Sequence, residues 1–112
     1  MLLLRTPLHL AAENGHLSVC QLIVENVHDK NSKDFNGITP FHEAAKNGHL
    51  SVCQLIVENV DDKNPKDNYG MTPLVLAILK NHLGIQTLIE NSLESVLVGS
   101  KQVSNTKKLK ME

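Results

Sequence analysis

Six histidines and two cysteines are the residues of this 112-residue chain that could bind a metal or supply a nucleophile and its base. No two histidines are spaced His-x₃-His, which would place them as a ligand pair on one helix. Most of these residues instead occur as copies separated by 33 residues: His9 and His42, His16 and His49, Cys20 and Cys53. Residues duplicated in this way are better explained as structural parts of a repeated unit. We therefore predict no metal, no cofactor and no catalytic residues.

The repeat itself is the strongest pattern in the chain. The segment TPLH at Thr6 returns as TPFH at Thr39 and as TPLV at Thr72. The run from Gly15 to Val27 returns unchanged at 48–60. A fixed period of about 20–50 residues indicates a solenoid, in which stacked units share one core. We name the units by their residues: unit 1 is 6–38, unit 2 is 39–71, and unit 3 begins at 72.

The first part of unit 1 predicts a short helix. Thr6 can cap it through the hydroxyl, and Pro7 suits the first helical position because its missing N–H costs nothing there. Gly15 is expected to end the helix in the left-handed conformation. Four residues between them should make apolar contacts, the alanines allowing close packing of a neighbour: Leu8, Leu10, Ala11 and Ala12.

The rest of unit 1 predicts a second helix and a projecting turn. Residues from about 17 to 26 place Leu17, Cys20 and Val24 on one apolar face. The polar stretch 29–37 ends in Asn-Gly, a strong indication of a tight turn. Each unit is therefore predicted to be helix, turn, helix and an extended turn.

Composition limits the function classes. Aromatic residues make up only 3% of the chain, so the core must be aliphatic. The net charge of −1 argues against nucleic-acid binding by the whole chain, and no stretch is long and apolar enough to span a membrane. We expect a cytoplasmic protein, with the nucleus as the alternative.

The two cysteines are expected to be buried thiols. Packed helices lie about 8–10 Å apart, whereas a disulfide requires Cα atoms within about 7 Å. Cys20 and Cys53 fall on the second helices of neighbouring units, so we predict that both are reduced.

These residues resemble the ankyrin repeat. The match is carried by the segments TPLHLAAxxGH, VxxLI and NxKDxxG and by the period, and it covers about residues 5–91. The resemblance implies an all-α solenoid of helix-turn-helix units with projecting β-hairpin fingers. It also implies that the motif histidines form hydrogen bonds within and between repeats. Arrays of this kind bind partner proteins through the fingers and the concave face of the first helices.

Some positions depart from the family pattern. Val27 and Val60 stand where glycine is usual, so we expect Asn26 and Asn59 to take the left-handed conformation instead. In unit 3, Asn81 replaces the turn glycine, a substitution that asparagine tolerates.

The ends of the array are also unusual. Glu90 replaces the valines of units 1 and 2 on the second helix, which suits a terminal unit. Unit 1 lacks a finger ahead of Thr6. We predict an array over 1–91, with a partial unit 3 at 72–91, followed by a short capping helix and a disordered lysine-bearing tail within 92–112. The chain is either a small array or a fragment of a longer one.

The differences between units 1 and 2 suggest where a partner binds. The units differ at only eight of 33 positions, of which three lie at the finger tip and one, Glu13/Lys46, on the exposed side of the first helix. Drift at exposed sites explains this as well as binding does, but Phe35 and Tyr69 favour binding because exposed aromatics are enriched in interfaces. The predicted contact residues are Phe35, Asn36, Ile38, Asn68, Tyr69 and Met71 on the fingers and Glu13, Asn14, Lys46, Asn47 and Lys80 on the first helices.

We therefore predict a non-enzymatic scaffold for an unidentified protein partner. The first alternative is a fragment of a larger ankyrin-containing regulatory protein, enzyme or channel. A weaker alternative is binding of nucleic acid or an anionic membrane by the tail, which carries Lys107, Lys108 and Lys110.

Overall fold

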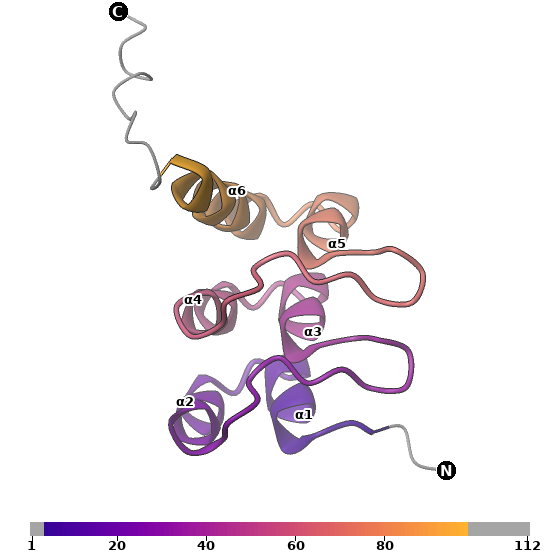
Figure 1. The fold of residues 1–112 in the computed structure, drawn as a ribbon, viewed down its shortest axis with the longest axis vertical. Coiled ribbons are helices and arrows are strands. Elements are labelled where there is room, and N and C mark those ends of the chain that lie inside the picture. Colours follow the sequence, from indigo (N-terminus) through magenta and orange to yellow (C-terminus); the bar gives the residue numbers. More distant parts are fainter. Residues whose placement is uncertain (1–3, 99–112) are drawn as a thin grey trace, which may run out of the picture.

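The computed structural model describes residues 4–98, and side chains as far as residue 94, as three stacked helix pairs (Figure 1). The first helices of the pairs form one column and the second helices another. The predicted all-α solenoid is confirmed. The predicted tail beyond residue 98 lies outside the described residues. The helices are α1 (Pro7–Glu13), α2 (Leu17–Asn26), α3 (Pro40–Lys46), α4 (Leu50–Val57), α5 (Pro73–Leu79) and α6 (Leu83–Val98).

The first helix of each unit begins as predicted. The Thr6 hydroxyl accepts a hydrogen bond from the N–H of His9, and Thr39 and Thr72 repeat this cap. Gly15 ends α1 with a φ of 71°, and Asn81 takes the same role in unit 3 with a φ of 62°. The left-handed asparagine in unit 3 is thus confirmed.

The core lies between the units and is aliphatic. The alanine pairs of α1 and α3 are buried where these helices pack together. Leu10 was predicted to join this core and does not, because its side chain remains 52% exposed. Cys20 and Cys53 are buried and free, as predicted. Burial raises the pKa of Cys53 to about 12, so this group remains a thiol at neutral pH.

The fingers are hairpin-like loops without β-strands among residues 4–98. We define finger 1 as residues 27–38 and finger 2 as residues 60–71. In finger 1, one Asp34 carboxylate oxygen accepts the N–H groups of Asn36 and Ile38, and the Asp34 N–H donates to the Ile38 carbonyl at 2.9 Å. Asp67 repeats the arrangement in finger 2. The side chains of Asp34 and Asp67 thus close these turns, where the resemblance implied paired β-strands.

The predicted exit from the second helices is wrong. Asn26 is the last residue of α2, and Val27 follows with an extended φ of −110°, which suits a β-branched residue. Helix α4 ends earlier, with Glu58 as its cap. Within residues 4–98 only Leu4 and Asn81 are non-glycine residues with positive φ, so neither Asn26 nor Asn59 is left-handed.

The last helix is longer than predicted. Helix α6 runs without interruption for 16 residues, from Leu83 to Val98, so no separate capping helix begins at residue 92. No glycine or proline follows Gly84 within it, and both Leu88 and Leu93 pack against the core. Continued apolar contact therefore extends the helix past the predicted boundary at Asn91.

Candidate functional site

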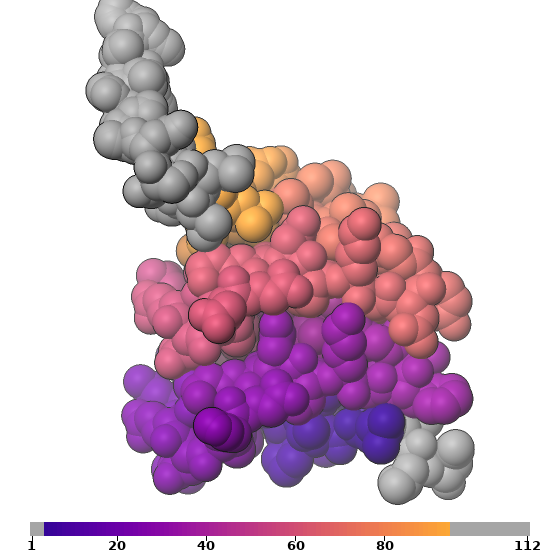
Figure 2. Space-filling model, viewed as in Figure 1, coloured from indigo at the N-terminus to yellow at the C-terminus, as the bar shows by residue number. Residues whose placement is uncertain are grey.

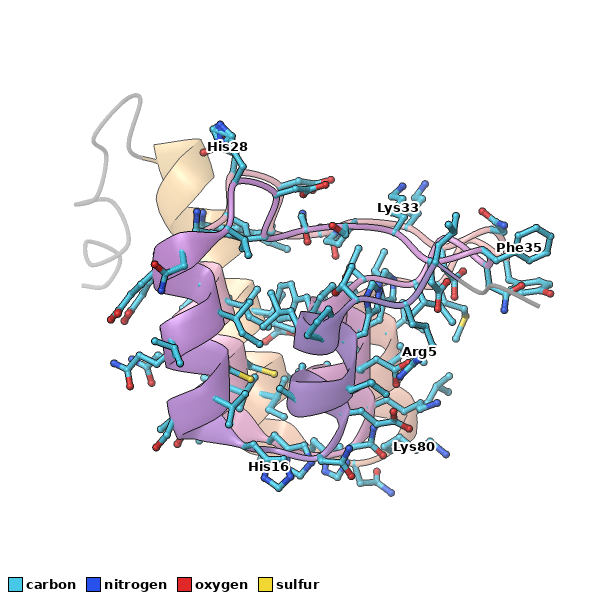
Figure 3. All side chains as sticks on the ribbon, turned by 90° about the horizontal axis from the view of Figure 1, so that it is seen from below. Arg5, His16, His28, Lys33, Phe35 and Lys80 are labelled. Atoms are coloured by element: carbon cyan, nitrogen blue, oxygen red, sulfur yellow. The ribbon has the colours of Figure 1, made fainter. Side chains whose placement is uncertain are left out.

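The fingers project away from the first helices and leave a concave angle between them (Figure 3). In this view along the stack, Phe35 lies at the finger tips and Lys80 lies near the opposite edge, where the helices turn. Arg5 lies between the two arms of the angle. The predicted contact residues are distributed over these two arms.

Two finger side chains are free for contact with a partner. Phe35 is 63% exposed and Tyr69 is 76% exposed, although both are large and apolar. Asn36, Ile38 and Met71 are half-buried. Asn68 is exposed as well. The six predicted finger residues therefore comprise three exposed side chains, two of them aromatic, and three half-buried ones.

The two fingers are joined to each other. The Asn68 N–H donates to the Asn36 carbonyl at 2.9 Å, and its side-chain amide donates to the Phe35 carbonyl at 3.1 Å. A Cβ atom on Gly37 would lie 2.6 Å from the Asn68 side-chain oxygen, so only glycine allows this approach. The predicted contact residue Asn68 thus holds the fingers together.

The first-helix candidates are mostly exposed and polar. Lys46 and Lys80 are exposed, as are Asn14 and Asn47. Each asparagine side chain donates to the carbonyl four residues earlier in its own helix, which leaves its oxygen available. The fifth candidate, Glu13, is half-buried.

The first-helix histidines join each first helix to the end of its own finger. His9 accepts the Thr6 N–H on Nδ1 at 3.0 Å, and its Nε2 therefore donates to the Ile38 carbonyl at 2.7 Å. His42 makes the same two bonds one unit later, to Thr39 and Met71. The predicted structural role is confirmed. Among the described residues, no three histidine, cysteine, aspartate or glutamate side chains lie close enough to hold a metal ion.

A second set of histidines joins the helix turns. His49 Nε2 lies 3.0 Å from the Glu13 carbonyl, and the ring covers Gly15 so closely that a Cβ atom there would collide with it. His82 makes the equivalent contact with unit 2. Units 1 and 2 are therefore each tied to the next unit at the end of the first helix. Unit 3 has Val75 in place of the motif histidine.

The same architecture is found when the chain is compared with family models. A model of ankyrin repeats, three copies, matches residues 8–97. The chain belongs to the ankyrin repeat family. Ankyrin repeats are generally protein–protein interaction modules and typically non-enzymatic. No curated protein matches the sequence. Within residues 4–98 of the ankyrin array, no helix is long and apolar enough to cross a membrane.

One cluster in the concave angle of the ankyrin array was not predicted. The Arg5 guanidinium lies 2.7 Å from the Glu43 carboxylate and 2.6 Å from that of Glu13, with Asp34 at 3.7 Å. The hydrogen bond to Glu43 raises the pKa of Arg5 most, and burial opposes it. Since Glu43 is only 4% exposed, Arg5 balances a buried charge.

One difference between the units does indicate this cluster in the sequence. Glu43 stands where units 1 and 3 have Leu10 and Leu76, and a carboxylate at a leucine position calls for a cation. Glu13 was predicted to contact a partner, but its carboxylate pairs with Arg5 within the chain. Lys46 lies 3.9 Å from Glu43, at the exposed edge of the same cluster.

The stability of the ankyrin array should depend on pH through His42. Burial lowers the pKa of His42 below its ordinary value of 6.5, against the opposing hydrogen bond to Met71. The unfolded chain therefore binds the proton more readily, and stability present above pH 6.5 is lost as the pH falls through the lowered pKa. We expect a lower melting temperature at pH 5.5 than at pH 7.5.

Two variants test the source of this pH dependence. His42→Val copies Val75 of unit 3 and should reduce the difference in melting temperature between the two pH values. His28→Val, at an exposed histidine, serves as the matched control and should keep it. An unchanged pH dependence in His42→Val would assign the effect to other groups.

Proposed function

We propose that this ankyrin array is a non-enzymatic scaffold that binds a protein partner through its fingers and concave face. The observation that carries the proposal is the exposure of Phe35 and Tyr69, 63% and 76%, at the finger tips. Exposed aromatics reduce solubility, and aromatics buried at an interface contribute strongly to affinity. Two of the three aromatic residues of the chain occupy these tips.

The rigidity of the fingers supports the same proposal. Each finger is closed by an aspartate, and Asn68 bonds one finger to the other. The first-helix histidines then tie each finger to the first helix of its own unit. Little conformational entropy is lost when such a surface binds, so more of the contact energy remains as affinity.

The polar residues of the first helices complement the aromatic tips. Lys46 and Lys80 place positive charge at the ends of α3 and α5, and Asn14 and Asn47 are exposed at the ends of α1 and α3. A partner seated in the angle would contact aromatic rings on one side and cationic or amide groups on the other. Charges at such a rim favour association rate and orientation more than affinity.

Alanine at both Phe35 and Tyr69 should abolish capture of the partner while leaving the melting temperature unchanged. Interface hot spots cost at least about 2 kcal/mol each, so loss of the pair would weaken binding by about a thousandfold or more. Affinity capture by the full chain, with mass spectrometry of the retained proteins, measures the loss.

The control removes exposed apolar side chains elsewhere. Leu17 and Leu50 are 39% and 45% exposed at the start of the second helices, away from the finger tips. Alanine at both should keep capture intact. If the Phe35 and Tyr69 variant binds normally, or loses its fold, the aromatic tips are not the binding surface.

A further inference from the structure

Three asparagines in the chain are each followed directly by a glycine: Asn14, Asn36 and Asn47. Such a pair is chemically reactive because glycine has no side chain to shield its backbone nitrogen from the preceding amide. The nitrogen can attack the side-chain carbonyl carbon of the asparagine, which is then converted to an acid. The three pairs are alike in sequence, but the fold holds them in two different settings.

Asn36 lies in the more constrained setting. The Gly37 N–H donates to the Asp34 carbonyl at 2.9 Å, and Gly37 is buried. The Asn36 N–H donates to the Asp34 carboxylate at 2.8 Å, and the Asn36 carbonyl accepts the Asn68 N–H. The two fingers also pack against each other, finger 1 in purple and finger 2 in rose (Figure 2). Reaction at Asn36 therefore requires finger 1 to open and to separate from finger 2.

Asn14 and Asn47 lie in a looser setting, at the ends of α1 and α3, and both are exposed. The glycine N–H groups that follow them form long hydrogen bonds within the helix turn, 3.3 Å for Gly15 and 3.4 Å for Gly48. The asparagine ψ angles of 2° and 5° turn each glycine nitrogen away from the asparagine side chain. Only the last turn of the helix must loosen to bring the two together, and helix ends open at low free energy.

We infer that Asn14 and Asn47 are sites of spontaneous deamidation in the folded chain. Hydroxide takes the proton from the glycine N–H, and the nitrogen forms a bond to the asparagine Cγ. The bond from Cγ to Nδ2 breaks, and the departing nitrogen takes a proton from water and leaves as ammonia. Water then opens the resulting cyclic imide at one of its two carbonyls, which gives aspartate or isoaspartate. Water and hydroxide are the only co-reactants, and nothing is oxidised or reduced.

The product weakens the turn in which it forms. The Asn14 amide donates to the Leu10 carbonyl at 2.9 Å, and the Asn47 amide donates to the Glu43 carbonyl at 2.9 Å. A carboxylate cannot donate these bonds, and it adds negative charge at the negative end of the helix dipole. Isoaspartate also lengthens the main chain directly before a glycine that a histidine ring of the next unit covers.

Deamidation would also change the proposed partner surface, since both asparagines belong to it. Two neutral amides become carboxylates next to Glu13 and Lys46 in the sequence. This consequence for binding rests on the proposed function. The reaction itself needs no partner, so it can be measured on the isolated chain.

The test incubates the full chain at pH 8 and follows each asparagine by peptide mapping with mass spectrometry. We expect Asn14 and Asn47 to convert at least about tenfold faster than Asn36, because reaction from an opened state follows the population of that state. In a sample unfolded in urea, the three asparagines should convert at similar rates. The urea midpoint of the folded sample should fall as conversion proceeds.

Two sets of variants serve as controls. Asp34→Ala removes the carboxylate that closes finger 1, so it should accelerate conversion at Asn36 and leave Asn14 and Asn47 unchanged. Unchanged rates at the helix ends would show that this variant remains folded. The double variant Asn14→Gln, Asn47→Gln keeps both amides, and its urea midpoint should stay constant during the same incubation.

Two results would overturn the inference. One is conversion of Asn36 in the folded chain as fast as that of Asn14 and Asn47. The other is no conversion at the two helix ends over a period in which the unfolded chain converts fully. Capture of a partner by the finger tips has no bearing on these rates, so failure of the proposed function would be recognised separately.

Discussion

Replacement of Ile56 by alanine is expected to lower the free energy of unfolding by about 2–5 kcal/mol. Ile56 is 1% exposed and belongs to the core that α4 shares with its neighbours. The lost methyl groups remove apolar burial and leave a cavity that rigid helices fill only in part. Unit 2 lies between the other two units, so its unfolding separates unit 1 from unit 3. The urea unfolding transition should therefore become broader as well as shift to a lower urea concentration.

The same substitution at Ile23 is the matched control. Ile23 occupies the equivalent position in a helix of identical sequence, but it is only partly buried. Its replacement should cost clearly less than that of Ile56. Urea denaturation followed by circular dichroism measures both. Equal costs would mean that the unit 1 end is as well packed as the middle of the stack.

Replacement of Arg5 by alanine is expected to cost about 1.5–3 kcal/mol, the range for hydrogen bonds to charged groups. The substitution leaves the Glu43 carboxylate, which is 4% exposed, without its cation. Arg5 also connects Glu13 of unit 1 with Glu43 of unit 2. The cost is therefore expected in the contact between these units.

A second variant tests whether the cost of Arg5→Ala comes from the unpaired Glu43 charge or from lost packing contacts. Glu43→Leu restores the residue found at Leu10 and Leu76 and removes the buried carboxylate. In that background, Arg5→Ala should cost much less, because no charge is left uncompensated. Equal costs of Arg5→Ala in the two backgrounds would show that Arg5 acts independently of Glu43.

The features that were predicted correctly from the sequence are those that the 33-residue period and the local helix caps determine. Thr6, Gly15 and His9 act within unit 1 and their roles recur in unit 2, so these roles can be inferred from the repeat. The unit 3 turn at Asn81 follows from the conformations that asparagine tolerates.

Three features depend on contacts that the repeat does not specify. Arg5 and Glu43 are 38 positions apart, and Arg5 precedes the first unit. The extended exit at Val27 is set by the path into the finger, which overrides the local preference of Asn26. Helix α6 continues because Leu88 and Leu93 still reach the core, which only the packed structure reveals.

The candidate site was predicted in outline only. The exposure of Phe35 and Tyr69 agrees with a contact role. Asn68 and Glu13 were chosen by the same reasoning, but both are engaged within the chain. Variation between copies marks positions that are free to change, and it does not distinguish a partner contact from a contact inside the stack.

The bonds between the fingers have a mechanical consequence. A force on the Phe35 tip passes through Asn68 into finger 2 and through the Ile38 carbonyl to His9 in α1. The load is thus divided between two units instead of bending one loop. A partner that pulls on this tip would have to bend the whole stack, and the array would resist that change in curvature elastically.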